Sequence, residues 1–453
     1  MDQDKQTSGS KTQILTVDLD EIGDFIFHEP EKSFLGDWDI NLAKDSHDAN
    51  NLLQAVKQLQ TSSRPVAFPT ETVYGLGADA TRSDAVAGIY AAKQRPADNP
   101  LIVHISSLGQ LRRLLAPTAG SQDGSPDART QGEIPAIYDP LISRFWPGPL
   151  TILLPLPNPS PLAPAVTGSL STFGVRMPSS RLALALIHLA GRPLAAPSAN
   201  ASTKPSPTTA AHVLHDLAGR IDLIIDGGPC TVGIESTVVD GLTHPPAILR
   251  PGGVSIDMIR QCPGWEHVAI GYNNSQNAEM SAPRAPGMKY KHYSPKARVI
   301  LVHGRLSFGL LTNYRPARGK IGLASTMTWR AEDLEVPQHT IIQDQNAPQD
   351  PGTKDLRRFA VKTLAADVPN DRSGDGPLTN GEIDQRSESI QFSSVNLGKE
   401  AASIARNLFS ALRELDLDGV DVIFVEAINE TDGDAAAAVM NRIRKAAESE
   451  IRS

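Results

Sequence analysis

Six polar turns between residues 68 and 254 place cations and hydroxyl groups beside a proline or glycine that fixes the backbone. In chain order they read FPTETVYGLG, KQRPADNPLIVHI, STFGVRMP, APSANASTKPSPTT, GIESTVVD and ILRPGGV. Arginine binds phosphate or carboxylate in a bidentate manner, and hydroxyl and backbone N–H groups satisfy the remaining acceptor atoms. Because few acidic residues accompany them, these turns together predict a cavity that binds anions.

The candidate site residues are the polar side chains of these turns. They are Thr72, Lys93, Arg95, Asn99, His104, Thr172, Arg176, Ser198, Asn200, Lys204, Ser206, Thr208, Ser236, Thr237 and Arg250.

Each of these residues also has a purely structural interpretation. Lys93 could favour the dipole at the end of a helix, and Arg176 could form a surface ion pair. His104 could be a hydrogen-bonded core histidine, and Thr208 could cap the helix that follows it. Six such clusters in one half of the chain nevertheless favour a functional site.

A further segment, residues 285–295 (APGMKYKHYSP), places two lysines, a histidine and two tyrosines inside a linker. Its prolines and its glycine allow it to swing and yet hold a bend. We expect this segment to act as a lid that folds across the cavity. The alternative is that these aromatic residues only attach the linker to the domains.

Two other motifs do not support nucleotide binding. GLGADA, which begins at Gly75, formally matches a dinucleotide-binding turn, but Thr70, Glu71 and Thr72 stand where a buried strand should precede it. GPCTVGIE has the glycine spacing of a P-loop, but it lacks the required Lys and Ser/Thr.

The elements that position these turns alternate between helix and strand up to about residue 261. A helix at 50–60 places Leu52, Leu53, Val56 and Leu59 on one face. Further helices are expected at 85–93, with Ser83 as the N-cap, and at 181–191. The expected strands, rich in β-branched residues, lie at 66–68, 101–105, 150–156, 223–226, 236–242 and 247–251.

The second half of the chain repeats this alternation on a smaller scale. Strands are expected at 297–304, 320–326 and 421–428, and helices at 400–415 and 434–447. The polar segments 119–134 and 344–396 are interpreted as insertions, the second of them disordered.

The predicted fold is therefore α/β. A flexible extension (1–45) precedes a catalytic domain (46–262), a linker or lid (263–295) and a small Rossmann-like domain (296–453).

Bulk composition narrows the function classes. The 453 residues carry a net charge of −8, so affinity for anions must come from local cationic clusters. No apolar run approaches the ~18 residues of a membrane span, so no membrane partner is expected. The two cysteines exclude a CxxC metal site and fit a reducing, cytoplasmic compartment.

Seven ordered strings resemble the YrdC-like domain of the L-threonylcarbamoyladenylate synthase family. They are FPTETVYGLG, KQRPADNPL, FWPGPLT, GVRMP, APSAN, GIESTVVD and LRPGG. The resemblance covers about residues 50–262 and extends through PGMKYKHYSP into the C-terminal domain of the two-domain members. The acidic N-terminal extension and the two insertions depart from the family pattern.

The resemblance implies a YrdC-like twisted sheet domain and a defined reaction. L-threonine, bicarbonate and ATP, the latter with Mg²⁺, give threonylcarbamoyl-AMP and pyrophosphate. The product would serve a downstream threonylcarbamoyl transferase complex that modifies tRNA to N6-threonylcarbamoyladenosine, and direct tRNA binding stays open.

Site roles follow from the same resemblance. Threonine is expected to contact Thr72, His104, Arg176, Ser198 and Ser236, with Arg176 on its carboxylate. ATP is expected to contact Arg95, Asn99, Thr172, Asn200, Thr208, Arg250, Tyr290 and Tyr293. With ATP bound, the lid is expected to place Tyr290 or Tyr293 near the nucleotide and Lys289 or His292 near its phosphates. Lys93 and Arg95 are expected to act on the phosphates as catalytic residues, and no protein ligand for Mg²⁺ is assigned.

Two alternatives compete with the synthase. A basic concave surface could instead bind an RNA backbone, which would show as salt-dependent binding without turnover. The related carbamoyl-transfer enzymes of hydrogenase maturation need paired zinc-type cysteines, which this chain lacks.

Overall fold

The computed structural model describes residues 11–28, 33–95, 99–116, 132–272, 292–314, 319–326, 329, 340–344, 356–363 and 389–452. The chain divides into two compact units. The first comprises Met1–Tyr293, Glu400–Ser410 and Asn429–Lys445. The second comprises Ser294–Lys399, Ala411–Ile428 and Ala446–Ser453. Two helical stretches from the end of the sequence therefore belong to the first unit.

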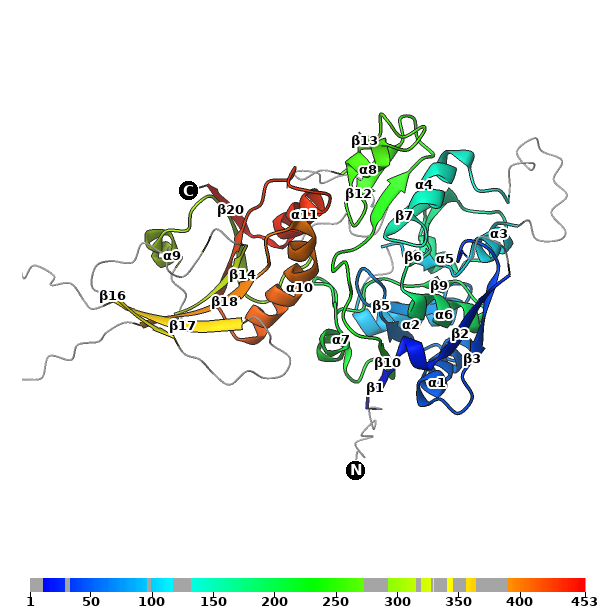
Figure 1. Ribbon diagram of the computed structural model, residues 1–453, viewed down its shortest axis with the longest axis horizontal. Coiled ribbons are helices and arrows are strands. Elements are labelled where there is room, and N and C mark those ends of the chain that lie inside the picture. Colours follow the sequence, from blue (N-terminus) through cyan, green and yellow to red (C-terminus); the bar gives the residue numbers. More distant parts are fainter. Residues whose placement is uncertain are drawn as a thin grey trace, which may run out of the picture. The chain divides into compact units, whose positions relative to one another are not determined.

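The first unit is built on a mixed sheet of 11 strands in the order β1-β10-β4-β5-β9-β6-β8-β7-β11-β12-β13. Figure 1 shows its strands with helices packed around them. The bounds are β1 (Gln13–Thr16), β4 (Val66–Phe68), β5 (Gly75–Asp79), β6 (Ile102–His104), β7 (Leu150–Pro155), β8 (Thr172–Arg176), β9 (Leu194–Ala195), β10 (Leu223–Asp226), β11 (Thr237–Asp240), β12 (Ala247–Arg250) and β13 (Ala269–Ile270). A separate hairpin pairs β2 (Gly23–Phe27) with β3 (Trp38–Leu42).

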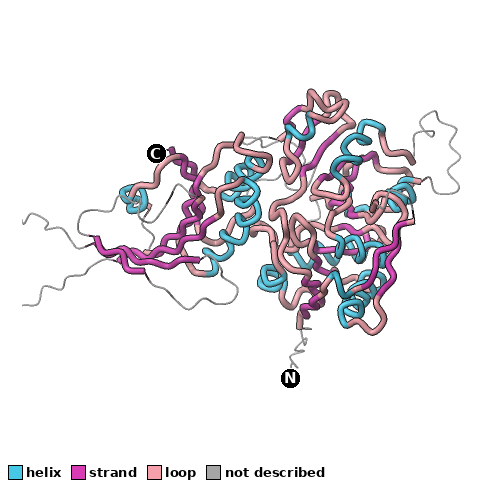
Figure 2. Tube along the Cα trace, viewed as in Figure 1, coloured by secondary structure: helices cyan, strands magenta, loops and turns pink. Residues whose placement is uncertain are grey.

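Helices cover this sheet, as the tube view of Figure 2 shows. They are α1 (His47–Thr61), α2 (Ser83–Lys93), α3 (Leu108–Leu115), α4 (Asp139–Phe145), α5 (Pro164–Thr167), α6 (Arg181–Ala190), α7 (Ala210–Leu217) and α8 (Ile256–Arg260). Local sequence explains their limits. Ser46 caps α1 by accepting a hydrogen bond from the Ala49 N–H, and Gly191 ends α6 in the left-handed conformation.

The expected apolar face of α1 is mostly correct. Leu52, Val56 and Leu59 are buried, whereas Leu53 is exposed. Ser83 is the first residue of α2 and Arg82 is its N-cap, so the expected cap was one residue too late. The dismissed GLGADA run is strand β5 followed by a turn, so it is not a phosphate-binding turn.

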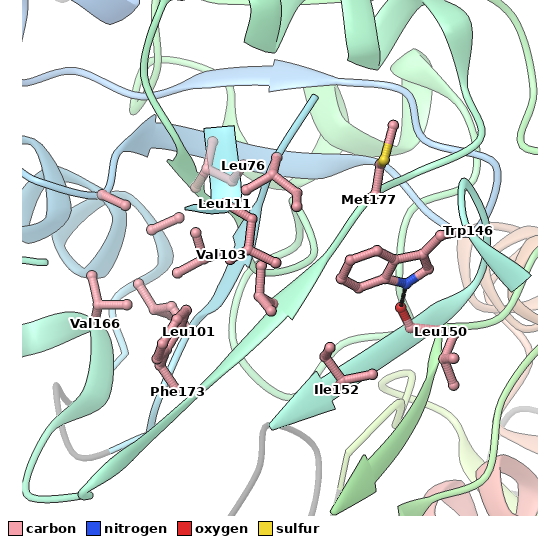
Figure 3. Packing of buried hydrophobic residues seen from close by; sticks show 14 of the residues in the cluster. Leu76, Leu101, Val103, Leu111, Trp146, Leu150, Ile152, Val166, Phe173 and Met177 are labelled. Atoms are coloured by element: carbon pink, nitrogen blue, oxygen red, sulfur yellow. Dashed lines mark hydrogen bonds between the residues drawn. The ribbon is translucent and has the colours of Figure 1, made fainter. Parts of the chain in front are cut away.

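Two large clusters of buried apolar side chains lie against the sheet. Figure 3 shows the side chains of Leu76, Val103, Ile152 and Phe173, from four strands, packed with Trp146. The Trp146 indole donates a hydrogen bond to the Leu150 carbonyl at 2.8 Å, which satisfies its buried N–H. Each buried aliphatic or aromatic side chain of this kind contributes about 1.5–3 kcal/mol, so the core fixes the strand ends on which the polar turns lie.

The prediction that residues 1–45 form a flexible extension is wrong for the described part. Strand β1 pairs in parallel with β10, from Gln13↔Leu223 to Thr16↔Asp226. The Thr12 hydroxyl donates to the Ile221 carbonyl at 2.6 Å and anchors the start of this strand. Only Leu15 of the four β1 residues is buried, so the sequence carries no periodic signal for this strand.

The second unit holds a sheet of seven strands in the order β16-β17-β18-β15-β19-β14-β20. Its bounds are β14 (Arg298–His303), β15 (Lys320–Ser325), β16 (Thr340–Asp344), β17 (Leu356–Thr363), β18 (Ser389–Asn396), β19 (Val422–Glu426) and β20 (Ser449–Arg452), with helix α9 (Phe308–Asn313). Parallel pairing joins β18, β15, β19, β14 and β20, as expected for a Rossmann-like domain. Helices α10 (Ala401–Leu417) and α11 (Ala436–Ala446) complete the described elements.

The prediction that the whole segment 344–396 is disordered is also wrong for its described part. β17 and β18 lie inside this segment and pair antiparallel over seven residue pairs. Residues 345–355 and 364–388 lie outside the described residues. The same is true of most of the other expected insertion (119–134), of which the structure describes only residues 132–134. Within the described residues, no helix combines the length and apolar character needed to cross a membrane.

Candidate active site

The first unit contains a partly open cavity of about 260 Å³ at the ends of several of its strands. Most of the side chains singled out in the sequence line it. They are Thr72, Lys93, Arg95, Asn99, His104, Arg176, Ser198, Asn200, Lys204, Ser206, Ser236, Arg250, His292 and Tyr293. Residues as far apart in the chain as Thr72 and Tyr293 are thus brought to one cavity.

One end of the cavity is formed by the last residues of two parallel strands. His104 ends β6, Arg176 ends β8, and the two residues are paired in register. Arg176 is buried, with Nη1 donating to the Thr72 hydroxyl at 2.8 Å. Its Nη2 lies 2.8 Å from Oε2 of the equally buried Glu71. This arrangement holds a guanidinium at the cavity wall, and a carboxylate behind it fixes its position.

His104 is neutral in this environment. Burial and the nearby Arg176 charge lower its pKa from 6.5 to about 3. Its Nδ1 lies 3.1 Å from the Ile102 carbonyl, which can only accept, so Nδ1 carries the proton. Nε2 is therefore a hydrogen-bond acceptor, suited to an N–H or O–H group of a bound molecule.

Lys93 differs from the sequence expectation of a cation at an open helix end. It ends α2, but its side chain is buried, and Nζ donates to the carbonyl oxygens of Ser198 and Asn200. The Asn200 side-chain N–H group donates in turn to the carbonyls of Ala201 and Lys204. Lys93 therefore fixes the APSAN turn and also presents positive charge to the cavity.

Arg250 and Ser236 form another part of the wall. Arg250 donates from Nε to the Ser236 carbonyl and from Nη2 to the Ser236 hydroxyl, both at 3.0 Å. The Ser236 hydroxyl also lies 2.8 Å from that of Thr151. Burial lowers the pKa of Arg250 to about 10, so the guanidinium stays charged at neutral pH.

The loop after β12 approaches this wall very closely. A Cβ atom on Gly252 would lie 2.3 Å from the carbonyl carbon of Ser236 and from the backbone nitrogen of Thr237. The first glycine of the LRPGG string, Gly252, is therefore required, because any side chain there would collide with the backbone of Ser236 and Thr237.

Two residues of the expected lid line the cavity. Burial lowers the pKa of His292 to about 4, with Lys445 and Arg95 contributing. Burial and the Glu235 charge raise the pKa of Tyr293 to about 12. Lys289 and Tyr290 lie outside the described residues. Arg95 lies close to Asn99, with Nη2 3.5 Å from the Asn99 carbonyl, and residues 96–98 between them lie outside the described part.

Two expected nucleotide contacts do not reach the cavity. Thr172 begins β8, four residues before Arg176, so the length of the strand separates it from the site. The Thr208 hydroxyl lies 2.9 Å from that of Ser410, outside the cavity lining, and its neighbour Thr209 caps α7.

The sequence analysis missed Glu235 as a site residue. It lines the cavity and accepts a hydrogen bond from Ser206 at 2.6 Å. The neighbouring guanidinium groups of Arg442 and Arg250 hold its pKa below the usual value, against the opposing effect of burial. Glu235 stands inside the GIESTVVD string, but an acidic residue did not fit an anion site, and its partner Arg442 is 207 residues away.

The donor set of the cavity does not fit a metal ion held by the protein. The described residues contain no group of three or more His, Cys, Asp or Glu side chains that could hold one. The lining carboxylate, Glu235, is ion-paired with Arg442.

The fold and site together define an α/β protein with a partly open cavity that suits an anionic substrate. The cavity is lined by cations, hydroxyl groups and a neutral histidine. Residues 58–252 match the family model described as "Telomere recombination", of the Sua5, YciO and YrdC proteins. Residues 254–448 match the family described as "Threonylcarbamoyl-AMP synthase, C-terminal domain".

Similar full-length proteins carry the same description. A threonylcarbamoyl-AMP synthase of Schizosaccharomyces pombe is 43% identical over 419 residues, covering 89% of each chain. That of Bacillus subtilis is 36% identical over 90% of this chain and 97% of its own. A crystal structure of Pyrococcus abyssi Sua5 complexed with L-threonine is 34% identical, with a TM-score of 0.66 over 98% of this chain and 100% of its own. The chain belongs to the threonylcarbamoyl-AMP synthase family.

Proposed function

We propose that this cavity joins L-threonine, bicarbonate and ATP to form threonylcarbamoyl-AMP and pyrophosphate. The observation that carries the proposal is the convergence of Arg176, His104 and Thr72 with Arg250 and Ser236 in one cavity. Membership of the synthase family and the threonine complex of the similar P. abyssi protein support it.

The chemistry requires two anions to meet. The ammonium group of threonine and bicarbonate combine to give a carbamate, a water molecule and a proton. A carbamate oxygen then attacks the α-phosphorus of ATP, a new P–O bond forms, and the bond to the β-phosphate breaks to release pyrophosphate. The carbamate and ATP are both anions and repel each other. The site must therefore neutralise their charges and position them, and this matters more than a strong base.

Arg176 and His104 suit the amino acid. The guanidinium would bind the threonine carboxylate, and Nε2 of neutral His104 would accept a hydrogen bond from the threonine. Thr72, which accepts from Arg176, would orient it, and Ser198 and Ser236 would complete this subsite.

The nucleotide would contact the cations on the other walls. We assign Arg95, Asn99, Asn200, Arg250 and Tyr293 to ATP, and Lys93 to its phosphates. Mg²⁺ would enter as part of the MgATP substrate, with phosphate oxygens as its main ligands, since Mg²⁺ commonly retains such ligands and water.

The lid stays part of the proposal. Closure of residues 285–295 over bound ATP would exclude water from the unstable mixed anhydride. The position of His292 and Tyr293 at the cavity supports this assignment. The product would pass to a transferase that modifies tRNA, and the buried free thiols of Cys230 and Cys262 fit a reducing compartment such as the cytoplasm.

An omission assay tests the function. Purified protein is supplied with ATP, L-threonine and bicarbonate, and pyrophosphate and the adenylate are measured. We expect turnover only when all three substrates are present. RNA binding with steep salt dependence and no turnover would overturn the proposal in favour of an RNA-binding module.

A further inference from the structure

Arg442 lies in α11, far from the cavity turns in sequence, yet it contacts two of them. Its side chain is almost fully buried, and Nε donates to Oε2 of Glu235 at 3.1 Å. Its Nη1 donates to the carbonyl of Pro251. Both contacts lie inside the first unit, which includes residues 429–445.

The two residues that Arg442 holds stand next to the cavity wall. Glu235 precedes Ser236, and Pro251 follows Arg250. Ser236 and Arg250 are hydrogen bonded to each other through both the carbonyl and the hydroxyl of Ser236. Arg442 therefore bridges the two loops whose neighbouring side chains form this wall.

The loop that carries Glu235 is also held by α10. Arg406 donates from Nε to the Thr231 carbonyl at 2.9 Å. Gly233 has φ +81°, and a Cβ atom there would lie 2.4 Å from the Cα of Arg406. The loop from Thr231 to Ser236 is thus packed directly against backbone and side chains of the C-terminal helices.

Charge balance gives Arg442 a specific task. Glu235 is a lining carboxylate in a cavity that must accept anions, and the charges of both Arg442 and Arg250 act on it. Without Arg442, Glu235 would still attract Arg250. The guanidinium of Arg250 would then move towards Glu235 and away from Ser236. The cavity then loses a correctly placed cation and presents a carboxylate that repels phosphate.

We propose that Arg442 is a positioning residue of the synthase site, which neutralises Glu235 and holds Pro251 so that Arg250 faces the nucleotide. This inference rests on the proposed function. It gives the C-terminal helices a role inside the catalytic unit.

The test is a double-mutant cycle with Arg442→Met and Glu235→Gln. The control is Arg444→Met, which removes an arginine of the same helix that pairs with Glu430 at 2.6 Å. The apparent KM values for ATP and threonine, the affinity for a non-hydrolysable ATP analogue and the thermal unfolding midpoint are measured for each variant. The control is expected to keep wild-type values.

We expect Arg442→Met to raise the KM for ATP about 10- to 100-fold, because a misplaced binding group has effects of this size. The KM for threonine should change by less than a factor of about 3, as for sites that do not share the interaction. Arg442→Met should also lower the unfolding midpoint, because Glu235 loses an ion-pair partner in a buried site.

The double variant separates positioning from stability. Glu235→Gln should restore the unfolding midpoint of Arg442→Met and also lower its raised KM for ATP, because residue 235 then carries no charge that attracts Arg250 or repels phosphate. The recovery of ATP affinity should be partial, since the contact of Arg442 with the Pro251 carbonyl is still missing, and the two substitutions should be far from additive. Recovery of the unfolding midpoint with no recovery of ATP affinity would overturn the proposal, as would additive effects of the two substitutions.

Failure of the proposed function shows differently. Wild-type protein without threonine-dependent turnover, but with the same non-additive loss of ATP-analogue affinity, would overturn the synthase reaction and support the positioning role. Full turnover in wild-type protein and unchanged ATP affinity in Arg442→Met would overturn the positioning role and support the reaction.

Discussion

Two buried arginine–glutamate pairs stand at the same cavity with opposite orientations. In the first pair Arg176 lines the cavity, and Glu71 lies behind it at 2.8 Å. In the second pair Glu235 lines the cavity, and Arg442 lies behind it at 3.1 Å. All four side chains are almost fully buried.

The difference shows what each pair does. A buried charge without a partner is costly. A buried cation at the cavity wall therefore needs a carboxylate behind it, and a buried carboxylate at the wall needs a cation behind it. The Arg176 pair presents a charge that binds an anionic substrate group. The Glu235 pair cancels a charge that would repel one, and this leaves Arg250 to act as the cation of its wall.

The largest expected effect comes from breaking the first pair. Arg176→Ala should raise the KM for threonine by a factor equivalent to about 1.5–3 kcal/mol, the value of a charge-assisted hydrogen bond, and leave the KM for ATP nearly intact. It should also lower the free energy of unfolding by about 3–5 kcal/mol, because Glu71 keeps a buried charge.

Steady-state kinetics and urea denaturation measure these two effects. In the double variant Glu71→Gln with Arg176→Ala, stability should recover while the threonine defect remains. An unchanged threonine dependence in Arg176→Ala would remove this arginine from the carboxylate role.

The next largest effect is expected on the pH dependence of the free energy of unfolding, through His104, which lies near Arg176 of the first pair. His104 has a pKa of about 3 in the folded protein and 6.5 as its ordinary value, so between these limits only the unfolded chain binds the proton. The free energy of unfolding should therefore fall by about 1.4 kcal/mol for each unit that the pH decreases below about 6.5.

His104→Gln should remove this contribution. We would compare urea denaturation of the two proteins between pH 6.5 and 4.5, where the curve of the variant should be flatter. Parallel curves for the two proteins would show that His104 is not held neutral.

A steric change at Gly252 should affect the part of the cavity wall that Arg250 and Ser236 form. Gly252→Ala places a Cβ atom 2.3 Å from the backbone of Ser236 and Thr237. Overpacking of this kind costs about 1–3 kcal/mol, and separation of the loops should raise the KM for ATP, because Arg250 is hydrogen bonded to Ser236 across them.

Gly191→Ala is the matched control for this substitution. Gly191 has a positive φ of 67°, and no atom lies within 4 Å of the added Cβ, so only backbone strain of about 1–2 kcal/mol is expected. Equal KM values for ATP in the two variants would contradict the role of the close contact at Gly252.

The smallest effect is expected for an exposed ion pair. Arg64 lies 2.8 Å from Asp222 with 43% of its side chain exposed. Arg64→Ala should change the free energy of unfolding by less than about 1 kcal/mol and leave both KM values unchanged, because water screens such pairs. A loss of unfolding free energy as large as that of Arg176→Ala would show that burial does not determine how much an ion pair contributes to stability.

Much of the molecule could be predicted from local sequence. The strings that end β6, β8 and β12 placed His104, Arg176 and Arg250 at one cavity, because proline and glycine turns limit where a short apolar strand can end. The resemblance to the synthase family rested on the same strings, and the family comparisons confirmed it.

Other features depend on contacts that no local pattern records. Strand β1 joins the sheet through backbone pairing with β10, more than 200 residues later, so its four residues looked like a loose extension. Lys93 ends a helix as expected, but the APSAN turn closes over its ammonium group. Thr172 shares a strand with Arg176, yet the rise along a β-strand places it away from the site.

The sequence by itself thus determined the types of side chain at the cavity and the elements that carry them, since periodicity, caps and turns act over a few residues. Only the tertiary structure decided the direction in which each charge faces. Glu235 is a wall residue rather than an obstacle to anion binding because Arg442, 207 residues away, is packed behind it. Electrostatic interactions in a buried site depend on distance in space, and folding brings those two charges together.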